Sequence, residues 1–412
     1  MTVSASCPVA HDFDPMGGAF LTDPFPQLAE LRAEGPVVYH PDYDLYFLTR
    51  YDDIEQVLLD RDTFAAANAS APVFPPCPAA AEVLASVKRV PTLTNADPPR
   101  HAPMRRAVQN NLTPRRLNAL EPIMREQSRR LIDELRTQPV ADLVPQLAFP
   151  LPAYAGFTLL GFPEADWEML KAWCSKRILM TYGRLPEEDQ VEVAQNVVAF
   201  WKYCEEHVAR REAEPGNDFT TDLLAWRSEH PDEVSFNDAV SIVYSIALAG
   251  HDSTTNLFTN GLRYLLANQE AWKAIVADPS LIPNAVEEML RYDPPILGWR
   301  RITTTDTVVG GVPLPKGAQL FMTFASAHRD ADKFPEPDTF DIGRENARSH
   351  LSFGKGVHLC IGAPLARLEM RVTLENLVEL TPDLRLVADQ EFAIVPNLVF
   401  RQMEHLLVET GA

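Results

Sequence analysis

Residues 353–362 read Phe353-Gly354-Lys355-Gly356-Val357-His358-Leu359-Cys360-Ile361-Gly362, a glycine-rich loop that contains a single cysteine. The residues that follow, 363–370, predict the first turns of a helix. A zinc site needs several ligands at short spacing, and no second Cys or His lies at zinc spacing from Cys360. A haem iron needs only one strong axial ligand from the protein, and a thiolate can provide it. The loop therefore predicts that Cys360 is a metal ligand of the kind that suits haem.

The alternative for Cys360 is a small buried hydrophobic residue, which is the ordinary fate of a free cysteine. The complete spacing of the loop argues against it, because the loop resembles the haem-binding loop of the cytochrome P-450 superfamily, Phe-Gly-x-Gly-x-(His/Arg)-x-Cys-x-Gly. This resemblance implies a haem b cofactor (iron protoporphyrin IX) with the Cys360 thiolate as its axial ligand. His358 fills a slot that is more often arginine, and a histidine is not obligatorily charged, so its contribution depends on pH.

Two further segments carry basic residues that match the same superfamily. The segment Asp-Pro-Pro-Arg-His-Ala-Pro-Met-Arg ends at Arg105 and places His101 four residues earlier, on the same face of a predicted helix. Taken alone, such a pair is ordinary surface decoration. Arg301 matches a family arginine that precedes a Gly-Gly turn, and Arg300 is the less favoured neighbour. The resemblance implies that His101, Arg105, Arg301 and His358 neutralise the haem propionates.

A long apolar helix is predicted from Ala239 to about Leu266, with Ser235 as its N-cap. Its middle reads Ala-Gly-His-Asp-Ser-Thr-Thr over residues 249–255. Glycine and clustered Ser/Thr residues disfavour a regular helix centre, so a local kink is plausible. The simplest interpretation is a core helix that tolerates a polar patch.

A functional interpretation of this patch follows from the resemblance. The patch is similar to the family motif (Ala/Gly)-Gly-x-(Asp/Glu)-Thr, whose polar side chains face bound dioxygen. Ser253 stands in the usual threonine slot and keeps the hydroxyl, but it lacks the methyl group that restricts χ1. The resemblance implies that Asp252 and Ser253 relay protons, with Thr254 as a substitute for Ser253.

The resemblance also implies a substrate pocket. Leu248 and Ala249 would face the substrate, because a small residue over the iron leaves room for it. Ile296 and Leu297 would line the same pocket. The apolar, weakly structured stretch 65–94 would form its roof, since long loops of this kind are often functional.

Other segments predict the scaffold rather than the chemistry. Glu288 and Arg291 are three residues apart on a predicted helix and can form an ion pair. With Arg344 they match a buried structural network of the superfamily. Residues 384–408 predict strands.

The composition excludes several classes of protein. The 412 residues carry a formal charge of −20, which opposes binding to nucleic acid and to anionic membranes. Five widely spaced cysteines argue against a disulfide framework and favour a reducing, cytoplasmic location. The stretch 143–163 has no charged residue, but its four prolines predict a buried segment rather than a membrane span.

These patterns and the resemblance predict one domain over residues 1–412, with an N-terminal arm over residues 1–24. The expected fold is mainly α with small β-sheets (α+β), with haem between the long central helix and the helix after the cysteine loop. The implied reaction inserts one oxygen atom from O2 into a small apolar or aromatic substrate, by hydroxylation or O-dealkylation. NAD(P)H would supply electrons through a ferredoxin or flavodoxin and its reductase, and the protein would be a monomer. The alternatives are a peroxygenase that uses hydrogen peroxide and a haem sensor without turnover.

Overall fold

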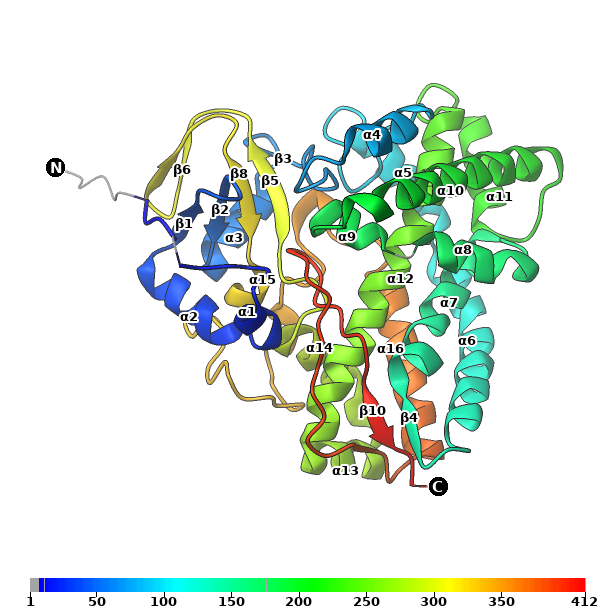
Figure 1. The fold of residues 1–412 in the computed structure, drawn as a ribbon. Helices are drawn as coiled ribbons and strands as arrows, with labels where there is room; N and C mark the ends of the chain where they lie inside the picture. The colour runs from blue at the N-terminus through cyan, green and yellow to red at the C-terminus, as the bar shows by residue number, and fades with distance from the viewer. Residues whose placement is uncertain (1–6, 11, 175, 412) are drawn as a thin grey trace.

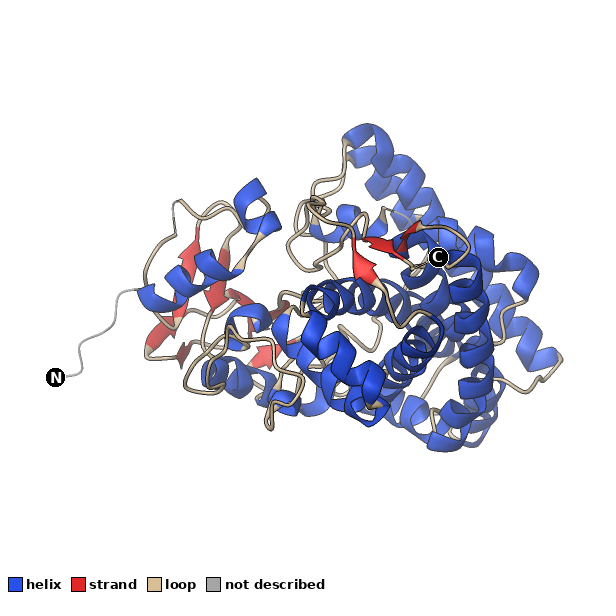
Figure 2. Ribbon diagram, turned by 90° about the horizontal axis from the view of Figure 1, so that it is seen from below, coloured by secondary structure: helices blue, strands red, loops and turns tan. Residues whose placement is uncertain are grey.

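The computed structural model describes residues 7–10, 12–174 and 176–411 of the chain. Helices fill one side of the molecule, and a small sheet with a few short helices forms the other side (Figure 1). Seen from below, the strands lie mostly on the sheet side, with a second small group near the C-terminus (Figure 2). This arrangement confirms the predicted class, mainly α with small β-sheets.

The long helix α12 (Phe236–Ala267) runs through the helical part and organises it. It begins with a reciprocal cap: the Asp238 amide donates to Ser235 Oγ (3.2 Å), and the Ser235 amide donates to Asp238 Oδ2 (2.9 Å). A cap of this kind stabilises a helix by about 1 kcal/mol. Most side chains of α12 are buried because other helices surround it.

The helices that surround or support α12 come from most of the chain. They are α4 (Pro78–Ala85), α5 (His101–Asn111), α6 (Pro114–Leu135), α7 (Pro150–Leu160), α8 (Trp167–Cys174), α9 (Arg177–Tyr182), α10 (Glu187–Ala213), α11 (Phe219–Glu229), α13 (Gln269–Ala277), α14 (Ile282–Tyr292) and α16 (Ala363–Leu380).

A five-stranded sheet forms the other side of the molecule, in the order β1-β2-β8-β5-β3. Its strands are β1 (Val37–His40), β2 (Leu45–Leu48), β8 (Gln319–Met322), β5 (Trp299–Thr303) and β3 (Phe64–Ala65). Strands β2 and β8 are parallel, and the other neighbours are antiparallel. Four short helices belong to this side of the chain: α1 (Gly18–Thr22), α2 (Phe25–Glu34), α3 (Tyr51–Leu59) and α15 (Phe324–Ala327).

Two smaller sheets complete the fold. One joins β6 (Thr307–Val309) to β7 (Val312–Leu314), and the other joins β4 (Val140–Asp142), β10 (Leu407–Glu409) and β9 (Arg385–Leu386). The prediction of strands throughout residues 384–408 was therefore wrong for most of that segment. Its middle is irregular because the side chain of Asn397 bonds the backbone of Val395 and Phe400, which holds a turn in place of a ladder.

Two other predictions, for residues 65–94 and 143–163, can be compared with the structure. The stretch 65–94 is not uniformly irregular, because it contains α4, whose Pro78 and alanine run favour a helix start. The proline-rich stretch 143–163 is mostly buried, as predicted, and forms a π-helical turn (Val144–Ala148) followed by α7. Among the described residues, no helix is long and apolar enough to cross a membrane.

The predicted structural network is present and buried. Arg291 donates to both carboxylate oxygens of Glu288 at 2.7 Å, and Arg344 Nε lies 3.2 Å from Glu288 Oε2. Arg291 also donates to three backbone carbonyls, those of His328, Pro337 and Thr339. The network therefore fixes the segment 328–344 onto α14.

Candidate functional site

The cysteine loop is held in a shape that depends on glycine. Gly356 has φ +67°, and a Cβ at this position would come within 2.6 Å of the Leu58 carbonyl oxygen. The Cys360 amide donates to the Phe353 carbonyl (2.8 Å), which closes the loop, and α16 begins three residues later. Arg367 of α16 donates to Glu287 Oε1 (2.7 Å), which ties the helix after the loop to α14.

The Cys360 thiol is exposed, yet it lies deep among protein atoms. A side chain that is both accessible and deep faces an interior surface of the molecule. Burial raises the pKa of the thiol, whereas the backbone N–H groups of Gly362 and Ala363 and the charge of Arg105 lower it. These amides belong to the start of α16, where backbone N–H groups lack helical partners and can stabilise a thiolate.

Four basic residues gather close to this thiol, and we call them the basic cluster: His101, Arg105, Arg301 and His358. The rings of His101 and His358 lie 4.2 Å apart between centroids, so α5 and the cysteine loop meet here. Burial and the charges of Arg301, His101 and Arg105 lower the pKa of His358 to about 3. Burial also lowers the pKa of Arg301 to about 10.

The chemistry of the basic cluster fits a dianionic ligand. None of its four members forms an ion pair with a carboxylate of the described residues. The Nε2 atom of His101 is buried without a hydrogen-bond partner. Buried cations are normally paired, so Arg105 and Arg301 fit two carboxylates of a ligand, to which the neutral histidines can donate hydrogen bonds. The two propionates of haem would supply these carboxylates, and the accessible thiol of Cys360 would bind the haem iron.

One face of α12 is also accessible, although the helix is otherwise buried. Ala249 is exposed at the helix centre, Ser253 is half-buried one turn later, and a Cβ on Gly250 would meet no atom within 4 Å. The Ser253 hydroxyl donates back to the Ala249 carbonyl at 2.7 Å. The structure therefore brings these predicted residues together on one stripe, with small side chains that leave the stripe open.

The side chain of Asp252 lies against α9 rather than on this accessible stripe. It is buried, and its Oδ2 lies 3.8 Å from the guanidinium of Arg177, the first residue of α9. That carboxylate oxygen has no hydrogen bond among the described residues. Thr254 is also buried. The proton-relay roles of Asp252, Ser253 and Thr254 stay predictions.

The four predicted substrate residues have different environments. Ile296 is half-buried and bridges to Phe400, whereas Leu297 is buried in the core cluster that includes β8. Leu248 is buried in the helical core cluster, and Ala249 is exposed. Their contact with a substrate stays a prediction.

Arg177 is the residue of this site that the sequence did not reveal. It lies on a short helix 75 positions before Asp252, in a middle third that carries no chemical motif. Burial alone would lower the pKa of Arg177, but Asp252 and nearby groups raise it. The only signal in the sequence was an arginine that follows Lys176 and precedes a short apolar run, which is too weak to identify a partner.

Comparisons with known proteins place this geometry in a family. A family model described as Cytochrome P450 matches residues 154–380. The cytochrome P450 monooxygenase PikC of Streptomyces venezuelae is 33% identical over 411 residues, which cover 98% of this chain and 94% of that protein. The structure of cytochrome P450 CREJ in complex with (4-ethylphenyl) dihydrogen phosphate is 36% identical, with a TM-score of 0.93 over 97% of this chain and 99% of that chain.

A second solved structure is matched over only part of its own length. An intact type IV self-sufficient cytochrome P450 monooxygenase is 36% identical, with a TM-score of 0.94 over 98% of this chain but only 54% of that chain. PikC and the self-sufficient enzyme are named as monooxygenases, so this chain is an oxidoreductase of that kind, and its cofactor is haem b with an axial cysteine thiolate. On the loop, the basic cluster and these similarities, the chain belongs to the cytochrome P-450 family.

Proposed function

We propose that this enzyme inserts one oxygen atom from O2 into a C–H bond of a small apolar or aromatic molecule, by hydroxylation or by O-dealkylation. The observation that carries the proposal is the accessible Cys360 thiol beside a basic cluster that has no carboxylate partner. CREJ, in the structure named above, binds an aryl phosphate, which supports an aromatic substrate here.

Each group of residues has a defined task in this proposal. Haem b, when bound, supplies the activation of dioxygen. Cys360 would hold its iron, and the amides of Gly362 and Ala363 would stabilise the thiolate. The basic cluster neutralises the propionates. Ala249 and Gly250 leave space over the cofactor for the substrate, and Leu248, Ile296 and Leu297 surround that space.

Proton supply falls to Asp252 and the hydroxyl groups beside it. Asp252 is buried and lies on α12 next to Ser253, whose hydroxyl is on the accessible stripe. Arg177 at 3.8 Å is close enough to hold the carboxylate and far enough to let it turn. We propose that Asp252 passes protons toward Ser253 Oγ, or toward the Thr254 hydroxyl in its place.

Asp252→Asn tests this role, because an amide keeps the shape of the side chain but cannot exchange a proton in the same way. We expect turnover to fall on the order of 100-fold. The substrate-induced change in haem spin state should keep its midpoint concentration, and the solvent isotope effect on turnover should rise. Equal rates of product formation in the two proteins would refute the relay.

We propose that electrons from NAD(P)H arrive through a separate ferredoxin or flavodoxin and its reductase. PikC is matched over 94% of its own length, whereas the self-sufficient enzyme is matched over 54%. We also propose that residues 1–412 act as one domain and that the protein is a monomer. A cytoplasmic location is proposed as well, and the free cysteines support it.

Turnover under ¹⁸O₂ tests the proposed reaction. The holoenzyme, NAD(P)H, a ferredoxin and its reductase should give product that contains one ¹⁸O atom per molecule. Product formed with hydrogen peroxide alone, but not with NAD(P)H and several redox partners, would identify a peroxygenase instead. No product under either condition, with substrate still bound, would identify a haem sensor.

A further inference from the structure

Arg300, next to Arg301 on β5, is a buried cation without a carboxylate. Its side chain is 97% buried, as its 3% exposure shows, and its Nε has no hydrogen-bond partner. Its guanidinium donates to the Ala71 carbonyl and lies 5.8 Å from the centre of the Tyr182 ring. Burial lowers the pKa of Arg300, and the only group that raises it is Tyr182.

The other buried arginines of the described chain show how unusual this is. Four of them form ion pairs with carboxylates: Arg291 and Arg344 with Glu288, Arg329 with Asp338, and Arg401 with Asp293. Only Arg300 and Arg301 do not. The haem propionates account for Arg301, but Arg300 needs a separate explanation.

The geometry of β5 prevents one ligand from serving both residues. Adjacent side chains on a strand point to opposite faces. Arg301 is paired with Leu320, and its charge lowers the pKa of His101 and of His358, so it lies on the side of the basic cluster. Arg300 is paired with Phe321. Phe321 belongs to the cluster that includes Tyr182 of α9 and Leu297. Arg300 therefore faces α9 and the predicted substrate side.

The surroundings of Arg300 suit the charged end of a small molecule. We call residues 66–77, which are part of the predicted roof 65–94, the roof segment. Its Ala71 carbonyl accepts a hydrogen bond from Arg300, and its Ser70 side chain bonds the Tyr182 hydroxyl. Tyr182 packs with Phe400 at 5.7 Å between ring centroids and belongs to the same apolar cluster as Leu297. A carboxylate or phosphate could reach the free Nε of Arg300 while an apolar body lies against these residues.

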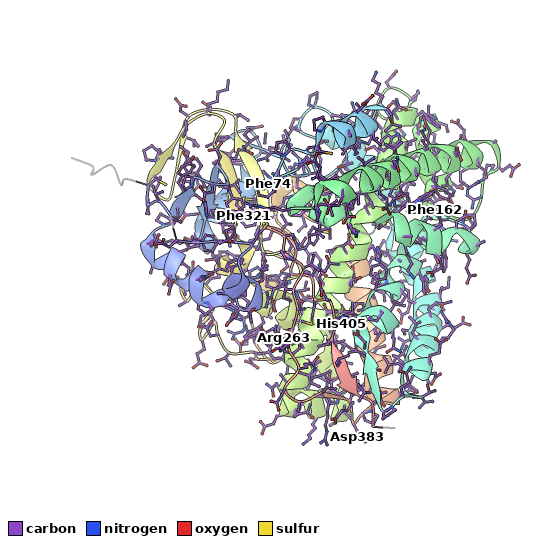
Figure 3. The ribbon with its side chains drawn as sticks, in the orientation of Figure 1. Phe74, Phe162, Arg263, Phe321, Asp383 and His405 are labelled. Carbon is purple, nitrogen blue, oxygen red and sulfur yellow. The ribbon has the colours of Figure 1, made fainter. Side chains whose placement is uncertain are left out.

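A pocket borders the roof segment close to Tyr182 in the sequence. A half-open pocket of 420 Å³ lies between Phe74–Pro76 and residues 180–185, and Gly183 on its wall follows Tyr182 directly. This volume is within the range of small-ligand sites. Figure 3 labels Phe74 and Phe321, and the two labels stand near each other on the sheet side of the molecule.

We propose that Arg300 anchors the anionic end of the substrate, so that the enzyme takes small apolar or aromatic molecules that carry a carboxylate or a phosphate. This inference rests on the proposed function and names its substrate class. The anchor leaves the other end of the molecule free to extend toward the accessible stripe of α12.

The test is a spectral titration of the holoenzyme with three matched probes: 4-ethylbenzoate, 4-ethylphenyl phosphate and the uncharged 4-ethylbenzamide. We expect at least one anion to bind on the order of tenfold or more tightly than the amide. The better of the two anions identifies the carboxylate or the phosphate as the natural group. Calorimetry provides a binding readout that does not depend on turnover.

Arg300→Gln should abolish the preference for the anion and leave the affinity for the amide unchanged, and Arg300→Lys should retain part of the preference. Arg385→Gln, which removes an exposed arginine on β9, should change neither affinity. No preference in the native enzyme, or an undiminished preference in Arg300→Gln, would overturn the anchor. If Arg300→Gln does not fold, the native preference and Arg300→Lys decide.

A failure of the Arg300 anchor can be distinguished from a failure of the proposed function. Arg300→Gln that oxidises 4-ethylbenzamide with NAD(P)H and redox partners would leave the monooxygenase proposal intact, whatever the anion affinities show. Native protein that binds the anions but forms no product would support the anchor and contradict the proposed reaction.

Discussion

Cys360→Ala is expected to abolish turnover completely and to remove the red-shifted Soret band of the reduced, CO-bound protein. The band requires a thiolate as the axial ligand of the iron, and no second cysteine lies in the loop. The variant should still fold, because the loop is closed by the backbone bond from the Cys360 amide to Phe353 and by the Arg367–Glu287 ion pair. Circular dichroism and the CO difference spectrum check the two statements.

Cys77→Ala is the matched control, since Cys77 is also free and partly accessible but lies in the roof segment. It should keep the shifted band at full intensity. A shifted band that survives in Cys360→Ala would show that another residue is the axial ligand, and the assignment of the site would then fail.

Arg291→Ala is expected to cause the largest loss of stability. Arg291 and Glu288 are both completely buried, and the side chain of Arg291 also holds three backbone carbonyls. Removal of one partner of a buried ion pair costs about 3–5 kcal/mol, because the other charge stays buried. This is a large share of the stability of an ordinary domain. Urea unfolding followed by circular dichroism measures the change.

The control is Arg130→Ala, which breaks an exposed i,i+4 pair with Glu134. Exposed pairs contribute about 0.3–0.5 kcal/mol, so its unfolding midpoint should barely move. A triple variant, Glu288→Gln with Arg291→Met and Arg344→Met, should recover part of the loss because it removes all three charges of the network. Equal midpoints for Arg291→Ala and Arg130→Ala would contradict a structural role for the network.

The sequence predicted those parts of the site that are contiguous. Ten consecutive residues define the cysteine loop, and Gly356 is needed there both for its φ and for its approach to Leu58. The polar patch at the centre of α12 was equally visible, because it interrupts an apolar run. A pattern formed by neighbouring residues can be recognised in the sequence without knowledge of the fold.

The sequence could not predict contacts between segments that have no shared pattern. Arg177 meets Asp252 only because α9 lies against α12 in the folded chain. In the sequence, Arg300 was the less favoured match to the family arginine. Only the register of β5 with β8 shows that the side chains of Arg300 and Arg301 point to opposite faces. The irregular segment around Asn397 depended on side-chain bonds to the backbone, which propensity does not report.

Every role assigned at this site depends on a bond between the Cys360 thiolate and haem iron. The most direct test is the absorption spectrum of the purified native protein after reduction and addition of CO. A strongly red-shifted Soret band that disappears in Cys360→Ala is the predicted result. A protein that stays colourless after reconstitution with hemin, or a CO spectrum without the shift, would contradict the account.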